Sequence, residues 1–185
     1  MKSTKQLHQK LINSCKQNNA KAQMQLYNLY CKAMFLVAKR YVKNAVLAED
    51  VMQDAFIKAF KNLHKYKGEV AFGAWLKRIV INQSIDQLKK NKLELVSIND
   101  EVYKVENDDD WSVENDVSIE GIVEIINNLK EKYRLVLTLY LLEGYDHNEI
   151  SEILKITATT SRTHLLRGKK LLREQLKNTS YAEGY

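Results

Sequence analysis

The 185-residue sequence has no proline, only six glycines and only two cysteines. At average usage, a chain of this length would contain roughly nine prolines. Turn-rich β-sandwiches, collagen-like repeats and proline-rich linkers all need proline or glycine in quantity, so these classes are excluded. Proline and glycine are also the residues that destabilise helices most strongly. Their scarcity therefore predicts an all-α fold built from long helices.

Further absences narrow the function. No apolar run approaches the ~18 residues of a membrane-spanning helix, so we expect no membrane insertion. The two cysteines stand 16 positions apart outside any CxxC motif, which favours free thiols in the reducing cytoplasm over a disulfide or zinc site. The sequence has no glycine-rich phosphate loop or nucleophile–base pair, and its four histidines are scattered: His8, His64, His147 and His164. We therefore expect no cofactor, no metal and no enzymatic activity.

The charge of the chain is unevenly distributed. Residues 1–92 carry 18 basic and 5 acidic side chains, whereas 93–120 carry 1 basic and 10 acidic ones, and 121–185 carry 10 and 8. A strongly basic block suits a polyanionic partner such as nucleic acid. We predict a basic domain over 1–92, an acidic linker over 93–118 and a second domain over 119–185. A solvated acidic loop is the alternative to the linker.

Apolar residues recur at helical spacing in both predicted domains. In the first domain this spacing predicts helices over 19–43, 48–66 and 71–90, with a loop at Gly68 before the last of them. Glu49 and Asp50 are expected in the first turn of the second helix, where the helix dipole favours acidic side chains.

In the second domain the same spacing predicts four shorter helices, over 119–128, 131–142, 147–154 and 158–177. Gly144 is expected to end the second of them as a C-cap. Asp146 and Thr157 are expected to cap the two helices that follow.

The last two predicted helices, joined by a tight turn, have the form of a helix-turn-helix motif. In the longer helix one stripe is small and apolar, which permits close packing: Ser161, Leu165, Gly168 and Leu172. The opposite stripe is polar and basic, with Arg162 beside it: Thr159, Thr163, Leu166, Arg167 and Lys170. Such residues can reach base edges in the major groove and phosphates beyond it. A plain helical hairpin with a solvated basic face is the alternative.

A second candidate nucleic-acid site lies in the predicted helix over 71–90. Asn82, Asp86 and Lys89 share one face, and Lys90 extends its basic end. Just upstream, aromatic residues stand among lysines: Tyr66, Phe72 and Trp75 with Lys61, Lys65 and Lys67. Rings that stack on bases and cations that meet the backbone are what single-stranded nucleic acid requires. We expect Tyr66, beside Gly68, to be exposed in the loop and Trp75 to lie in the core.

Three segments together resemble a known family. AEDVMQDAFIKAF, then FGAWLKRIVINQSID, then LEGYDHNEISEILKITATTSRTHLLRGKKLLREQL resemble the extracytoplasmic-function sigma factors, the minimal two-domain class of bacterial sigma factor. The resemblance covers about 26–92 and 119–177. It implies that the first domain binds core RNA polymerase and opens the −10 element, and that the second reads the −35 element of promoter DNA. It also implies an anti-sigma factor as a partner.

The resemblance also assigns residues. It places the polymerase-binding surface at Asp50, Gln53, Asp54 and Phe56. It makes Asn82 the reader of a flipped −10 base and Tyr66 the aromatic of the same pocket, with Asp86, Lys89 and Lys90 beside them. It matches Arg162, Thr163, Leu166 and Arg167 to the −35 recognition helix. Polar residues of the same predicted helix add Thr159, Thr160 and Lys170 to the expected −35 contacts.

The sequence departs from the family pattern at three places. Lys130 stands where the family usually has proline, Thr159–Ser161 replace a common Gly-Thr-Val, and Tyr140 replaces a frequent arginine. These departures bear on which promoter is read. A helix-turn-helix regulator that acts without polymerase is the alternative, but it leaves the first domain unexplained.

Overall fold

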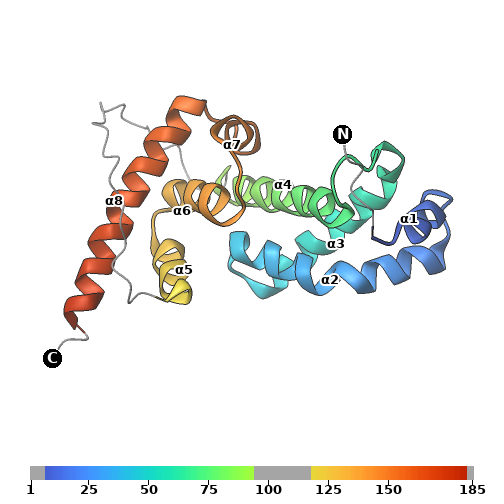
Figure 1. The fold of residues 1–185 in the computed structure, drawn as a ribbon, viewed down its shortest axis with the longest axis horizontal. Coiled ribbons are helices and arrows are strands. Elements are labelled where there is room, and N and C mark those ends of the chain that lie inside the picture. The colour runs from blue at the N-terminus through green and yellow to red at the C-terminus, as the bar shows by residue number, and fades with distance from the viewer. Residues whose placement is uncertain (1–6, 94–117, 183–185) are drawn as a thin grey trace. The chain divides into compact units, whose positions relative to one another are not determined.

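A computed structural model of the chain describes residues 7–93 and 118–182, with only the backbone described at 91–93 and 178–182 (Figure 1). The chain divides into two compact units, Met1–Ile98 and Asn99–Tyr185. Every regular element in the described ranges is helical, which confirms the predicted all-α fold. The predicted linker over 93–118 lies almost wholly outside the described residues.

The first unit is a helical bundle. It contains α1 (Gln9–Lys16), α2 (Ala20–Val42), α3 (Ala45–Lys61), a 3₁₀ turn (Leu63–Lys65) and α4 (Phe72–Leu93). Helices α2, α3 and α4 pack against one another, while the short α1 packs on α2 and on the 3₁₀ turn (Figure 1). The largest fully buried side chains of this unit come from α1, α2, the 3₁₀ turn and α4: Ile12, Leu26, Tyr41, Leu63, Phe72, Leu76, Ile81 and Ile85.

Asparagine caps set the starts of the two central helices. The side-chain oxygen of Asn19 accepts a hydrogen bond from the Ala22 amide at 3.0 Å, and that of Asn44 accepts one from the Leu47 amide at 2.9 Å. The helix predicted over 48–66 therefore begins three residues earlier, at Ala45, and ends at Lys61. As a result Glu49 lies in the second turn, and the prediction that Glu49 and Asp50 occupy the first turn of this helix is wrong.

The second unit consists of α5 (Ile119–Asn128), α6 (Glu131–Leu137), a π-helical turn (Thr138–Leu142), α7 (His147–Leu154) and α8 (Ala158–Ala182). Helix α8 is the long element of this unit, and α5, α6 and α7 pack against it (Figure 1). The π-helical turn continues α6 without a break and leads into the loop before α7. The Glu143 amide bonds the carbonyl five residues earlier, that of Thr138, at 3.1 Å, which is the hydrogen-bond pattern of a π-helix.

The predicted helix signals in this unit are confirmed. Gly144 has φ of 76°, the left-handed conformation that glycine adopts without strain. The Asp146 carboxylate accepts from the amides of Asn148 and Glu149, and the Glu149 side chain bonds back to the Asp146 amide, forming a capping box. The Thr157 hydroxyl accepts from the Thr160 amide at 3.0 Å. These caps define the two helices of the helix-turn-helix.

The small residues of α8 allow the close packing that their stripe predicts. Ser161, Leu165 and Leu172 are buried. A Cβ atom added at Gly168 would stand 2.9 Å from a terminal methyl of Leu137 and 3.4 Å from the Cβ of Tyr133. Because these distances leave no room for a larger side chain without a shift, Gly168 lets α8 approach α6.

Candidate functional site

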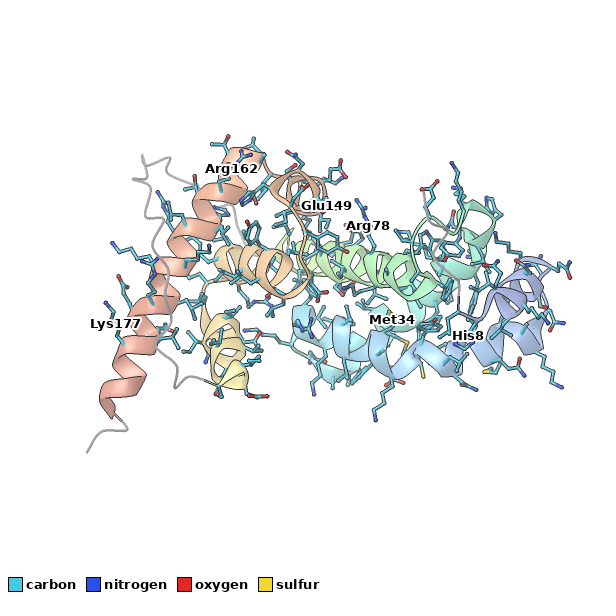
Figure 2. The ribbon with its side chains drawn as sticks, viewed as in Figure 1. His8, Met34, Arg78, Glu149, Arg162 and Lys177 are labelled. Atoms are coloured by element: carbon cyan, nitrogen blue, oxygen red, sulfur yellow. The ribbon has the colours of Figure 1, made fainter. Side chains whose placement is uncertain are left out.

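The polar stripe of α8 lies on the surface, opposite the packed stripe. Thr159, Arg162 and Lys170 are exposed, and the remaining members, Thr163, Leu166 and Arg167, are half-buried. Figure 2 shows Arg162 near the start of α8 and Lys177 far along the same helix. The structure thus brings the predicted base-reading residues together on the outer face of the second helix of a helix-turn-helix.

Threonine hydroxyls near the start of α8 make contacts within the helix itself. The Thr160 hydroxyl lies 2.8 Å from that of Thr157, and the Thr160 amide donates to the same Thr157 oxygen. The Thr163 hydroxyl donates to the Thr159 carbonyl at 3.1 Å. The Thr157 hydroxyl caps the helix start through the Thr160 amide, and the Thr163 hydroxyl is bonded to the backbone, whereas Arg162 is exposed on the helix surface.

A cluster around His147 joins the two helices of the motif, and the sequence did not reveal it. The Nδ1 atom of His147 lies 2.9 Å from the Ser161 hydroxyl on α8. The His147 ring stacks on Tyr140 with centroids 5.0 Å apart, and the Lys169 ammonium lies 5.9 Å from the centre of the Tyr140 ring. Tyr140, which replaces a charged residue of the family pattern, therefore fixes the position of α7 against α8.

Burial lowers the pKa of His147 below its ordinary value of 6.5, and the positive charges of Arg162 and Lys169 lower it further, while Asp146 raises it. A neutral imidazole can share a hydrogen bond with Ser161 without placing a third cation beside Arg162 and Lys169. The helix-turn-helix is therefore built around an uncharged His147 at neutral pH.

This environment predicts a titration. We expect the NMR resonances of the His147 ring to titrate with a midpoint below pH 6.5, and Arg162→Ala to raise that midpoint because it removes a neighbouring positive charge. Since the folded state binds the proton less well than the unfolded state, the stability from this group is full above pH 6.5 and falls as the pH drops toward the folded pKa. A midpoint at or above 6.5 in the wild-type protein contradicts this prediction.

In the first unit, the candidate −10 residues lie along α4. Asn82 and Lys89 are half-buried, and Asp86 and Lys90 are exposed. Spacings of four and three place the first three on one face of a continuous helix, as predicted. On a neighbouring part of α4, the Gln83 amide oxygen accepts from the Lys58 ammonium at 3.2 Å, which ties α4 to α3.

The prediction that Tyr66 is exposed in the loop is wrong. Tyr66 is only 3% exposed, and its hydroxyl donates to the Val70 carbonyl at 2.7 Å. Its ring packs on Phe72 and Trp75, with centroids 5.6 and 5.2 Å away. Burial raises the pKa of its phenol, with a further contribution from Tyr30. Since neither face of its ring is accessible to a base, Tyr66 stabilises the loop from its buried side.

The other aromatic expectations divide. Phe72 is buried, and Trp75 is half-buried against Phe72 and Tyr66, so Trp75 belongs to the edge of the core as predicted. The exposed residues of the loop itself are those that follow Tyr66: Lys67, Glu69, Val70 and Ala71. Gly68, with φ of 79°, makes the turn that Tyr66 holds in place.

Helix α3 presents an acidic face with an apolar residue at its end. Asp50, Gln53 and Asp54 are exposed, but Phe56 is 2% exposed and packs on Tyr27 and Phe60. Phe56 is therefore a core residue, and its ring is not available at the surface of α3. Sequence reasoning missed Ile57, which is 52% exposed and follows Asp54 by three residues on the same face. The signal for it was an apolar residue at helical spacing from polar ones.

No group of three or more histidine, cysteine or acidic side chains that could hold a metal occurs among the described residues. Within the same ranges, none of the helices is both long enough and apolar enough to cross a bilayer. Both cysteines are free thiols, and burial raises the pKa of Cys15.

Family models match both units. Residues 26–94 match sigma-70 region 2, and residues 119–172 match sigma-70 region 4. The two matched segments contain the acidic face of α3, the polar face of α4, and the helix-turn-helix as far as residue 172 of α8.

Curated relatives are similar over nearly their whole length. The ECF RNA polymerase sigma factor SigW of Bacillus subtilis is 30% identical over 181 residues, covering 91% of this chain and 96% of the relative. The ECF RNA polymerase sigma-E factor of Haemophilus influenzae is 28% identical over 179 residues, covering 91% and 94%. The shared length includes both units and the segment between them.

Solved structures share the fold. The sigma factor RpoE of Bartonella quintana, in complex with the anti-sigma factor NepR, has a TM-score of 0.54 at 22% identity and covers 83% of this chain and 96% of its own. CnrH, in complex with the cytosolic domain of CnrY, has a TM-score of 0.52 at 20% identity and covers 91% and 96%. At these identities the likeness concerns the arrangement of helices.

Proposed function

Because this chain belongs to the extracytoplasmic-function sigma factors of the sigma-70 family, we propose that it binds core RNA polymerase and directs it to specific promoters. The observation that carries this proposal is the pairing of a region 2 unit and a region 4 unit in one chain. A regulator that only binds DNA has use for the second unit alone. In this role the protein carries out no reaction of its own, and it acts in the cytoplasm with the polymerase.

We assign the −35 element to α8. Arg162 is exposed near the start of this helix, where a guanidinium can pair with a guanine in the major groove. The other contacts of this surface are Thr159, Thr160, Thr163, Leu166, Arg167 and Lys170. Lys170 lies further along the helix, where it reaches the phosphate backbone. Because the Thr160 hydroxyl is engaged by Thr157, it acts mainly on the helix start.

We assign the −10 element to α4 and to the loop before it. Asn82 is half-buried on a polar face, and its amide can both donate to and accept from the edge of an unstacked base. Lys89 and Lys90 follow toward the end of the helix, where cations attract the phosphates of the opened strand. Asp86 lies between Asn82 and Lys89 on the same face, where its carboxylate can accept a hydrogen bond from an amino group of a base.

We assign polymerase binding to the exposed face of α3. Asp50, Gln53 and Asp54 supply acidic and polar contacts, and Ile57 supplies the apolar one. A large apolar side chain surrounded by polar ones is typical of the centre of a protein interface. Phe56 supports this surface from within.

Two further parts of the proposal rest on relatives. A sigma factor with this fold was solved in complex with an anti-sigma factor, so we propose that an anti-sigma factor controls this chain as well. The acidic segment over 93–118 carries charge of the same sign as nucleic acid. We propose that it occupies a basic channel of the polymerase, which its charge suits.

Run-off transcription with purified core RNA polymerase tests the function. We expect promoter-dependent initiation only when this protein is added, on templates selected from genomic DNA with the reconstituted holoenzyme. DNA binding by the protein alone as a dimer to a two-fold site, with no initiation on addition of core, would instead support the regulator that acts without polymerase.

A further inference from the structure

Helix α1 precedes the segment that matches region 2, which begins at residue 26. It nevertheless contacts the loop that leads to the proposed −10 helix. The Lys16 ammonium, at the end of α1, donates a hydrogen bond to the Tyr66 carbonyl oxygen at 2.8 Å, across 50 positions of sequence. The same ammonium lies 5.9 Å from the centre of the Tyr66 ring, within the range of a cation–π contact.

Tyr66 begins the loop and also holds it closed. Its amide bonds the Leu63 carbonyl at 3.1 Å, which joins it to the 3₁₀ turn. Its hydroxyl donates to the Val70 carbonyl at 2.7 Å, which spans the turn at Gly68. The loop between these two contacts is exposed. Its shape therefore depends on where the Tyr66 backbone and ring are held.

Helix α1 is a firm support for this contact. Ile12 is fully buried and Cys15 is 1% exposed, so one side of the helix is anchored in the core of the first unit. Just before it, His8 meets Tyr30 edge-on with centroids 6.4 Å apart, and Tyr30 meets Phe72 at 5.3 Å (Figure 2 labels His8). The loop is thus held from α1 through Lys16 at one end and through the aromatic cluster at the other.

The positive charge of Lys16 strengthens its contact with the Tyr66 carbonyl. A hydrogen bond from an ammonium to a carbonyl is stronger than one between neutral groups. The Tyr66 carbonyl is part-buried, so removing the donor leaves it without that partner in a place where water has limited access. Lys16 itself is exposed, which means that its charge is not needed for folding of the core.

We propose that Lys16 is a positioning residue for promoter opening, which holds the 66–71 loop in the shape that receives an unpaired −10 base. This inference rests on the proposed function of the first unit. It assigns to α1, outside the matched region, a part in base selection. Lys16 acts through Tyr66 and the loop and does not touch the base.

The test compares three variants of the full chain in holoenzyme. Lys16→Met keeps the length of the side chain and removes the donor, Lys16→Arg retains a cationic donor, and Lys21→Met removes an equal charge from an exposed position in the first turn of α2. The probe is a fluorescent single-stranded oligonucleotide from the −10 region of the promoter with the strongest run-off signal. A second probe carries a substituted base at the flipped position.

We expect Lys16→Met to reduce the affinity ratio between the two probes by roughly three- to tenfold, less than the full loss of a charge-assisted hydrogen bond would give, because Lys16 acts on the base only through Tyr66 and the loop. Lys16→Arg should retain most of the ratio, and Lys21→Met all of it. Affinity for core polymerase should stay unchanged in all three. Amide hydrogen exchange in 66–71 of the free protein should be faster in Lys16→Met than in the other variants, a readout that is independent of DNA.

The outcomes separate the two proposals. If wild-type holoenzyme initiates but Lys16→Met keeps both the probe ratio and the slow exchange, the positioning role is wrong and the function stands. An equal loss of the ratio in Lys21→Met also overturns the positioning role, because it shows a general effect of charge. If wild-type protein does not support initiation with core polymerase, the proposed function fails and the inference fails with it.

Discussion

Replacing Arg162 with alanine is expected to reduce −35-dependent initiation by about five- to 150-fold, because a bidentate contact to a base is worth about 1–3 kcal/mol. Arg162 is exposed near the start of α8, and the fold of the motif does not depend on its burial. The measurement is run-off transcription from the selected promoter, and from the same promoter with each −35 base pair substituted. The variant should lose discrimination at one position of the −35 element.

The matched control is Lys177→Ala. It removes one positive charge from near the other end of the same helix (Figure 2). Lys177 is therefore too far from the start of α8 to contact the bases that Arg162 is proposed to read. We expect this control to keep full discrimination and to lose at most a small part of the salt-dependent affinity. If Arg162→Ala discriminates among −35 sequences as well as the wild type does, Arg162 does not read a base.

Replacing Asn82 with alanine is expected to impair strand opening more than binding to closed duplex. Extruding a base from the stack costs a few kcal/mol. Proteins that bind an extruded base offset this cost with a pocket whose polar groups form hydrogen bonds to the base. Without the Asn82 amide we expect roughly ten- to 100-fold fewer open complexes, with duplex affinity changed less than about threefold. Permanganate reactivity of unpaired thymines reports opening, and a mobility shift at low temperature reports duplex binding.

Gln87→Ala is a suitable comparison for Asn82→Ala. It removes a half-buried side-chain amide from the same helix, five positions on and therefore on a different face. The comparison variant should open the promoter as the wild type does. Identical permanganate footprints for wild type and Asn82→Ala would show that another residue receives the base.

Much of the helical architecture followed from local signals. Side-chain periodicity is a property of neighbouring residues, so the apolar spacing in 131–142 and 147–154 was sufficient to predict helices there. Caps are equally local. Asp146 and its partner Glu149 are three positions apart, and a capping box forms between them whatever lies beyond. Gly144 ended its helix for the same reason.

Local signals were insufficient where a segment is stabilised by distant ones. Helix α1 has eight residues and no side-chain cap at its start, so its sequence alone gave little indication of a helix. Short helices are marginal in isolation. This one forms because Ile12 and Cys15 are buried against the rest of the first unit.

Tyr140 shows the same limit in the second unit. In the sequence Tyr140 stands where the family pattern often has arginine, which indicates only that one charged contact of that pattern is lost. In the structure its ring stacks on His147 and lies near the Lys169 ammonium, so it joins parts of the chain up to 29 positions apart. The lowered pKa of His147 likewise depends on burial and on the charges of Arg162 and Lys169, which lie far from it in the sequence.

The sequence by itself determined the helical class, the polar stripe of α8 and the family, because each depends on residue types at fixed spacings. The tertiary structure decided which aromatic rings are available to a partner. Tyr66 and Phe56 both occupy positions that the family pattern associates with contacts, yet both are buried. Burial is a sum of contacts from segments remote in sequence, here α1 through Lys16 for Tyr66 and α2 through Tyr27 for Phe56. No local pattern contains that sum.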